Sequence, residues 1–105
     1  MRPGGVFLNH GIVYSATYRR RGPSFTDYYV FPDGELVPIS TSLRAAELSG
    51  FEVRDVESLR EHYGLTIHHW ARRLEAHAEE ARRITDDTTY RTWRLYMAGA
   101  AHWFP

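Results

Sequence analysis

The stretch that decides the fold is residues 50–70, GFEVRDVESLREHYGLTIHHW. It begins at Gly50, which we expect to end a helix over residues 38–49, because glycine readily adopts the left-handed conformation found at helix C-termini. Apolar residues at intervals then predict a strand over residues 51–58. The stretch therefore indicates a helix that stops, a strand and the beginning of a further helix.

Two long helices are predicted after this strand. The first is expected over residues 66–84, following a turn at residues 62–63, because its apolar residues recur with the three- and four-residue spacing of an amphipathic helix. The second is expected over residues 88–103, with Asp86 or Asp87 as its N-cap. These helices supply most of the apolar surface of the C-terminal half.

Residues 6–13, VFLNHGIV, predict a second strand, buried on both faces as in a parallel sheet. The order strand, loop, helix, strand, helix, helix is of the α/β class. Two strands do not form a stable sheet by themselves. We therefore expect one domain over residues 1–105 whose sheet is completed by oligomerisation or by a partner.

The composition excludes several classes of protein. Thirteen basic and 13 acidic residues give a formal net charge of zero, which argues against a nucleic-acid partner because phosphate binding needs a basic face. The absence of cysteine excludes disulfides and thiolate chemistry and fits a reducing cytoplasm. No apolar run reaches the length of a transmembrane helix. The six histidines lack metal-binding spacing, so no metal site is expected.

Two polar residues follow the predicted strands, His10 late in the first and Tyr63 just after the second. The carboxyl ends of parallel strands meet at one edge of a sheet, where ligand sites collect. An imidazole N–H and a phenol O–H placed there would donate hydrogen bonds to a small anion. Two alternatives stay open: His10 as a hydrogen-bonded core histidine, and Tyr63 as a residue that only packs against the next helix.

Five segments, taken in order, carry a family resemblance: MRPGGVFLNHGI, FPDGEL, LRAAELSGFEVRDVESLREHY, TIHHWARRLEAH and YRTWRLYMAGAAHWF. Together the segments resemble the C-terminal part of the cyclopropane-fatty-acyl-phospholipid synthases, which include the mycolic acid cyclopropane synthases. The resemblance implies part of a class I methyltransferase fold, with two or three strands and three or more helices. It also implies S-adenosylmethionine as methyl donor, an acyl-chain double bond as acceptor, and bicarbonate as the base, held by His10 and Tyr63.

The departures from the family pattern are as informative as the matches. The cofactor-binding half, with its glycine-rich loop, has no counterpart, so neither S-adenosylmethionine nor bicarbonate is expected to bind this chain alone, and no methyl transfer is expected from it. The family's last strand, which would lie between the two predicted strands, is also missing. Aromatic residues are candidates for an acyl-chain wall, with plain core as the alternative: Tyr28, Tyr29, Phe31, Trp70, Trp93 and Trp103.

Three other functions remain compatible with the sequence. A self-associating module without enzymatic activity would cover the exposed strand edges with a second copy. A subunit that completes a separately encoded cofactor domain would cover them with a partner. A carrier of apolar ligands would use the aromatic residues as its binding surface.

Overall fold

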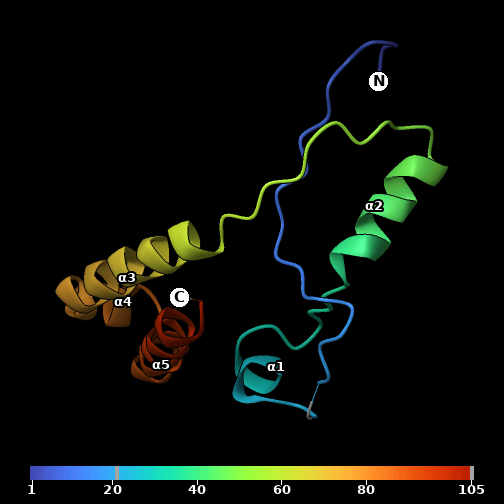
Figure 1. The fold of residues 1–105 in the computed structure, drawn as a ribbon. Helices are drawn as coiled ribbons and strands as arrows, with labels where there is room; N and C mark the ends of the chain where they lie inside the picture. Colours follow the sequence, from blue (N-terminus) through green and yellow to red (C-terminus); the bar gives the residue numbers. More distant parts are fainter. Residues whose placement is uncertain (21, 105) are drawn as a thin grey trace. The chain divides into compact units, whose positions relative to one another are not determined.

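The computed structural model describes residues 1–20 and 22–104, and these residues form a helical structure (Figure 1). Its helices are α1 (Phe25–Tyr29), α2 (Ile39–Leu48), α3 (Arg60–Ala76), α4 (Ala78–Ile84) and α5 (Asp87–Trp103). The chain divides into two compact units, which are described separately. One comprises Met1–Arg21 and Glu35–Arg54, and the other comprises Gly22–Gly34 and Asp55–Pro105. The expectation of a single domain stays a prediction.

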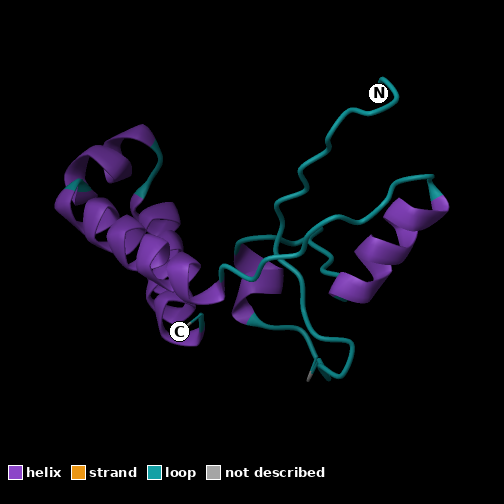
Figure 2. Cartoon of the chain, turned by 45° about the horizontal axis from the view of Figure 1, so that its top comes forward, coloured by secondary structure: helices purple, strands orange, loops and turns teal. Residues whose placement is uncertain are grey.

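The predicted strands over residues 6–13 and 51–58 are wrong for the described part of the chain, which contains no strand (Figure 2). Its one β-type contact is an isolated parallel bridge between Tyr14 and Pro38. The reason is the lack of pairing partners, because a strand persists only when neighbouring strands take up its N–H and C=O groups. The resemblance places a third, missing strand between the two segments, so they are not expected to pair directly.

In the first unit, the helix predicted over residues 38–49 is confirmed as α2. It ends in a Schellman motif: the amide of Phe51 donates to the carbonyl of Ala46 (3.0 Å) and that of Gly50 to Glu47 (3.0 Å). Gly50 has φ +88°, the left-handed conformation that the sequence predicted. Phe51 also contacts the Phe7 ring, with centroids 5.7 Å apart. This ring contact joins the two strand-like segments.

In the second unit, α3 begins at Arg60 instead of Thr66, so Tyr63 lies within the helix and not in a preceding turn. The amide of Tyr63 already donates to the carbonyl of Leu59 (2.8 Å). Glu61 in the first turn complements the positive end of the helix dipole. The helix signal was missed because Gly64 resembles a breaker, whereas in the structure this glycine is buried.

The helix predicted over residues 66–84 is interrupted at His77, which separates α3 from α4. The His77 backbone leaves the helical region (φ −114°, ψ 31°). Its Nδ1 atom lies 2.8 Å from the carbonyl oxygen of Arg73 and donates to it. Local side-chain hydrogen bonds of this kind compete with continued helix, and the apolar periodicity of the sequence does not register them.

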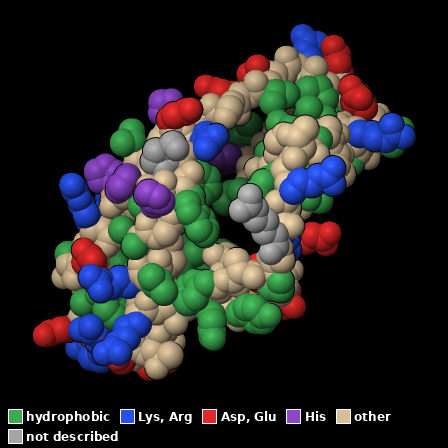
Figure 3. Space-filling model, turned by 60° about the horizontal axis from the view of Figure 1, so that its bottom comes forward, with side chains coloured by type: hydrophobic (Ala, Val, Ile, Leu, Met, Phe, Trp, Pro, Cys, Tyr) green, Lys and Arg blue, Asp and Glu red, His purple; other side chains and the backbone are tan. Residues whose placement is uncertain are grey.

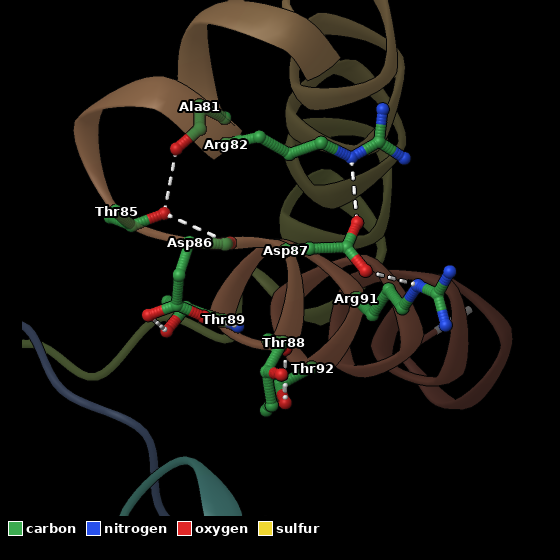
Figure 4. Close-up of polar contacts among 9 residues, drawn as sticks. All are labelled: Ala81, Arg82, Thr85, Asp86, Asp87, Thr88, Thr89, Arg91 and Thr92. Carbon is green, nitrogen blue, oxygen red and sulfur yellow. Dashed lines mark hydrogen bonds and ion pairs between the residues drawn. The ribbon is translucent and has the colours of Figure 1, made fainter.

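Asp86 is the N-cap of α5, whereas Asp87 forms ion pairs (Figure 4). The carboxylate of Asp86 accepts from the Thr89 amide (2.7 Å) and the Thr89 hydroxyl (2.9 Å). Asp87 pairs with Arg82 of α4 and with Arg91 of α5, each through Nε at 2.9 Å. The guanidinium of Arg82 also lies over the Tyr90 ring, 4.3 Å from its centroid. These contacts fix the beginning of α5 to α4.

The core of the second unit lies between α3 and α5. Ile67 of α3 is 1% exposed and packs against Ala100 and Ala101 of α5, which are also buried. The small side chains at positions 100 and 101 let α3 approach α5 closely. Four larger side chains surround this cluster: Tyr63, Tyr96, Met97 and Phe104.

Candidate functional site

His10 belongs to the first unit, in an irregular segment instead of a strand. Its side chain is exposed and makes no hydrogen bond to any other residue that the structure describes. The alternative of a hydrogen-bonded core histidine is therefore not realised in this structure. Apolar neighbours share this exposure, with Val6 at 94% and Leu8 at 86%. His10 is thus available to a ligand, on a segment without a covering layer.

Tyr63 belongs to the second unit, on the face of α3 that meets α5. Its ring meets the Phe104 ring at a centroid distance of 4.8 Å and the Trp70 ring at 5.9 Å, both near edge-on. Arg60, one turn earlier, donates from Nε to the Phe104 carbonyl (3.1 Å) and so holds the end of α5 beside this site. The alternative expected Tyr63 to pack against the next helix, whereas Tyr63 lies inside that helix, α3, and packs against Phe104 at the end of α5. Whether it shares one anion with His10 stays a prediction.

A residue that the sequence analysis missed, Tyr96 of α5, stands in the same cluster as Tyr63. Burial raises the pKa of the Tyr96 hydroxyl above its usual value, and the neighbouring Tyr63 raises that pKa further. A phenol with a raised pKa stays protonated and remains a hydrogen-bond donor. Its position three residues after Trp93, on one helix face, was the available signal.

Three of the aromatic residues form a group with edge-to-face geometry. Phe31, which follows α1, contacts Trp93 at 6.0 Å and Tyr96 at 5.7 Å, and Trp93 and Tyr96 are 5.6 Å apart, all between ring centroids. Of the predicted acyl-chain wall, the structure therefore brings together Phe31 and Trp93, and it places Trp70 against Tyr63.

The remaining wall candidates lie outside this group. Tyr28 and Tyr29 are 68% and 67% exposed, and Trp103 is 69% exposed. Tyr29 contacts Phe25 at a centroid distance of 5.1 Å, and Tyr28 contacts Tyr29 at 6.4 Å. These side chains are surface residues of the second unit in this structure. Many other apolar side chains also reach the surface (Figure 3).

Within residues 1–20 and 22–104, no three or more histidine or acidic side chains are grouped closely enough to hold a metal ion. None of the helices described combines the length and the apolar character needed to span a membrane.

Comparison with known proteins identifies the family of this chain. The family described as mycolic acid cyclopropane synthetase matches residues 1–105, so the chain belongs to that family. The family resemblance seen in the sequence is thereby confirmed. The family is one of S-adenosylmethionine-dependent methyltransferases with the class I methyltransferase fold.

Individual relatives support the same assignment. The chain is 44% identical to a probable fatty acid methyltransferase of Pseudomonas putida over 108 residues, covering 99% of this chain and 27% of the relative. It is 36% identical to the probable fatty acid methyltransferase Rv3720 of Mycobacterium tuberculosis, and the match covers 95% of this chain and 24% of the relative. It is 35% identical to cyclopropane mycolic acid synthase 3 of M. tuberculosis, and the match covers 98% of this chain and 33% of the relative. The chain thus spans about a quarter to a third of the length of these relatives.

Proposed function

We propose that this chain supplies the acyl-chain and bicarbonate side of a lipid methyltransferase and acts together with a cofactor-binding portion that lies outside residues 1–105. The observation that carries the proposal is the family match over residues 1–105 in a chain that spans about a quarter to a third of its relatives. The sequence contains no glycine-rich loop after a strand. In this proposal S-adenosylmethionine therefore binds to a portion of the enzyme outside residues 1–105.

In this proposal His10 and Tyr63 hold bicarbonate by donating an imidazole N–H and a phenol O–H to its oxygens. Once an acyl-chain double bond has accepted a methyl group, the resulting carbocation must lose a proton from that methyl group as the cyclopropane ring closes. Bicarbonate takes this proton and becomes carbonic acid, so charge and atoms balance. The exposed imidazole and the unbonded phenol are both free to accept such a ligand.

Mixing the full chain with a P. putida relative truncated to remove its matching stretch tests the proposal. The readout is transfer of a labelled methyl group from S-adenosylmethionine to vesicles of unsaturated phospholipid. Activity is expected only in the mixture. In the variants His10→Ala and Tyr63→Phe it should fall about 100-fold or more, the usual contribution of a proton-transfer group. The matched control Tyr18→Phe, 59% exposed, should keep full activity.

Three results would contradict this function. The first is micromolar binding of S-adenosylmethionine to the isolated chain in a calorimetric titration. The second is full activity of the His10 and Tyr63 variants in the mixture. Inactivity of the mixture, with both components folded and associated, would also count against a completing portion.

Self-association without catalysis is the second candidate, favoured by the exposure of Val6, Leu8 and Phe7 (94%, 86% and 64%). Contiguous exposed apolar side chains mark interaction surfaces, and a second copy is an available occupant. Light scattering on the isolated chain separates the two functions. A monodisperse monomer at high concentration argues against self-association, whereas a stable oligomer that excludes the cofactor-binding portion supports it.

A further inference from the structure

An open groove on the second unit is lined by three arginines. Its volume is about 670 Å³, and its lining includes Glu75 of α3, Arg82 of α4, and Tyr90, Arg91 and Arg94 of α5. Arg91 and Arg94 lie three residues apart on one helix, so their side chains leave the same face of α5. The packing of α4 on α5 brings Arg82 to them. Three guanidinium groups from two helices therefore border one hollow in the surface.

The chain's own carboxylates hold these guanidinium groups by one nitrogen each. Asp87 pairs with Nε of both Arg82 and Arg91 (2.9 Å each), and Glu75 pairs with Nε of Arg94 (3.0 Å). No terminal nitrogen of the three donates a hydrogen bond to another residue within 1–20 and 22–104. Figure 4 shows Arg82 and Arg91 on either side of the Asp87 carboxylate, with their terminal nitrogens turned away from it. The groove therefore keeps N–H donors for a further anion.

Arg82 is held from two sides. Besides its ion pair with Asp87, its guanidinium lies over the Tyr90 ring, 4.3 Å from the centroid, and Tyr90 itself is buried. Exposed ion pairs add little to the free energy of folding, but they limit the conformations of a long side chain. A side chain that is already ordered loses less conformational entropy when a ligand binds. The donors of the groove are thus arranged before any ligand arrives.

The charge of the groove restricts the ligand. Three guanidinium groups and the carboxylates of Glu75 and Asp87 leave one positive charge there. A phosphodiester carries one negative charge, and its tetrahedral oxygens accept from guanidinium groups on different sides, whereas a planar carboxylate is matched by one arginine fork. The chain as a whole has a formal net charge of zero. The groove therefore suits a single phosphate group instead of the row of phosphates in a nucleic acid.

We infer that this groove binds one phosphate ester group through Arg91 and Arg94 of α5 together with Arg82 of α4, and that a phospholipid headgroup at a bilayer surface supplies it. The choice of a phospholipid as the source rests on the proposed function, whereas the phosphate chemistry rests on the groove alone. A soluble phosphate would use the same donors. Because the groove is open to solvent, the headgroup can be bound while it remains part of a lipid surface.

Flotation of the full chain with lipid vesicles tests this site. Vesicles of phosphatidylcholine and phosphatidylglycerol in equal parts are compared with vesicles of phosphatidylcholine alone, in about 0.1 M sodium chloride. Arg91→Gln and Arg94→Gln each remove one guanidinium and should weaken binding to the mixed vesicles about threefold or more. The matched control is Arg72→Gln, which removes the same charge from an exposed residue of α3 that does not line the groove. Its binding should equal that of the parent chain.

A second arm identifies the source of the phosphate. Sodium phosphate is titrated into the full chain against sodium chloride of equal ionic strength, and the arginine Nε–H signals are followed by nitrogen-15 NMR. The signals of Arg91 and Arg94 are assigned with the two glutamine variants. Their movement with one dissociation constant, in a chain that does not bind vesicles, supports the site and assigns it to a soluble phosphate. Their movement together with vesicle binding supports the headgroup.

Three outcomes overturn the groove as a phosphate site. Equal losses in Arg72→Gln, Arg91→Gln and Arg94→Gln would show that only net charge matters. Vesicle binding that survives both groove substitutions would place the contact elsewhere, and binding in neither arm would leave no ligand. A circular dichroism spectrum matching the parent excludes unfolding of a variant. Neither arm depends on methyl transfer, so failure of the proposed function, seen as an inactive mixture, is distinguished from failure of this site.

Discussion

Gly99 shows at the scale of a single residue how the structure changes the interpretation of a helical glycine. A glycine inside a helix usually indicates close packing, but a Cβ atom at this position would meet nothing within 4 Å. A glycine inside a helix is less favourable than alanine by about 0.5–1 kcal/mol. Gly99→Ala should therefore stabilise the isolated chain by about that amount, measured by urea denaturation followed by circular dichroism.

Gly50 provides the control for this prediction. Gly50 has φ +88° with open space around it, so alanine there suffers backbone strain without a clash. Gly50→Ala should be destabilising by about 1 kcal/mol, opposite in sign to Gly99→Ala. Destabilisation by Gly99→Ala would show that its surroundings in solution are filled, for example by a second copy.

Asp86 gives a pH-dependent prediction at the same scale. The backbone hydrogen bond from Thr89 is the main cause that lowers the pKa of its carboxyl, followed by the Thr89 hydroxyl. A carboxyl with a lower pKa in the folded state stabilises the fold above its unfolded pKa, near 3.8. This contribution disappears as the pH falls through the folded-state pKa. Asp86→Ala should thus lower the unfolding midpoint at pH 7, and this effect should become smaller as the pH falls below 3.8.

A matched change of Asp86 separates capping from charge. Asn caps helices about as well as Asp. The unfolding midpoint of Asp86→Asn at pH 7 should therefore stay close to that of the parent protein, and its dependence on pH should be lost. Thermal unfolding of the three proteins between pH 2.5 and 7 checks this. An equal pH dependence in Asp86→Asn would assign the effect to other carboxyl groups.

At the scale of elements, the packing of α3 on α5 depends on one face of α3. Ile67 is 1% exposed, whereas Leu65, on the same helix, is 63% exposed. Truncating a buried aliphatic side chain costs about 2–5 kcal/mol through lost burial and the cavity left behind. Ile67→Ala should therefore destabilise the second unit by about this amount. Leu65→Ala should change the free energy of unfolding by less than about 0.5 kcal/mol.

Denaturant unfolding followed by tyrosine and tryptophan fluorescence checks this pair of variants, because Tyr63 and Tyr96 pack against the same cluster. Trp70 contacts the first of these tyrosines and Trp93 the second. Equal effects of the two substitutions would mean that α3 presents another face to α5 in solution. A large effect of Leu65→Ala alone would indicate that a second copy covers its exposed side.

At the scale of the whole molecule, the chain combines an ordered helical core with strand-like segments that lack partners. No amide of residues 6–13 donates a backbone hydrogen bond to a described residue. These amides should exchange with solvent at nearly unprotected rates, whereas those in the middle of α3 and α5 should be protected. Hydrogen exchange followed by mass spectrometry measures both in one experiment.

Adding the truncated P. putida relative should slow exchange in residues 6–13, because a sheet would then supply partners for their N–H groups. The first-turn amides of α3 serve as an internal reference for helix that is already formed. Protection of residues 6–13 in the isolated chain would mean that the chain pairs with itself, as the self-association alternative requires.

The sequence by itself determined what depends on local chemistry. It identified the family, the range of α2 and its stop at Gly50, and the aspartate cap of α5. Caps, left-handed glycines and family motifs are properties of a few neighbouring residues, so a linear pattern carries them. The strand signals at residues 6–13 and 51–58 are equally local, but a strand also needs neighbours to pair with, and the described chain has none to offer.

Only the tertiary structure decided which residues meet. It placed Tyr63 inside α3, interrupted the long helix at His77 and packed Tyr63 and Tyr96 against one buried cluster formed by α3 and α5. Such pairings join positions more than 30 residues apart, and they follow from how apolar faces pack rather than from any spacing along the chain. A periodic pattern shows that a helix has a buried face, whereas the partner on the other side of that face is settled by the fold.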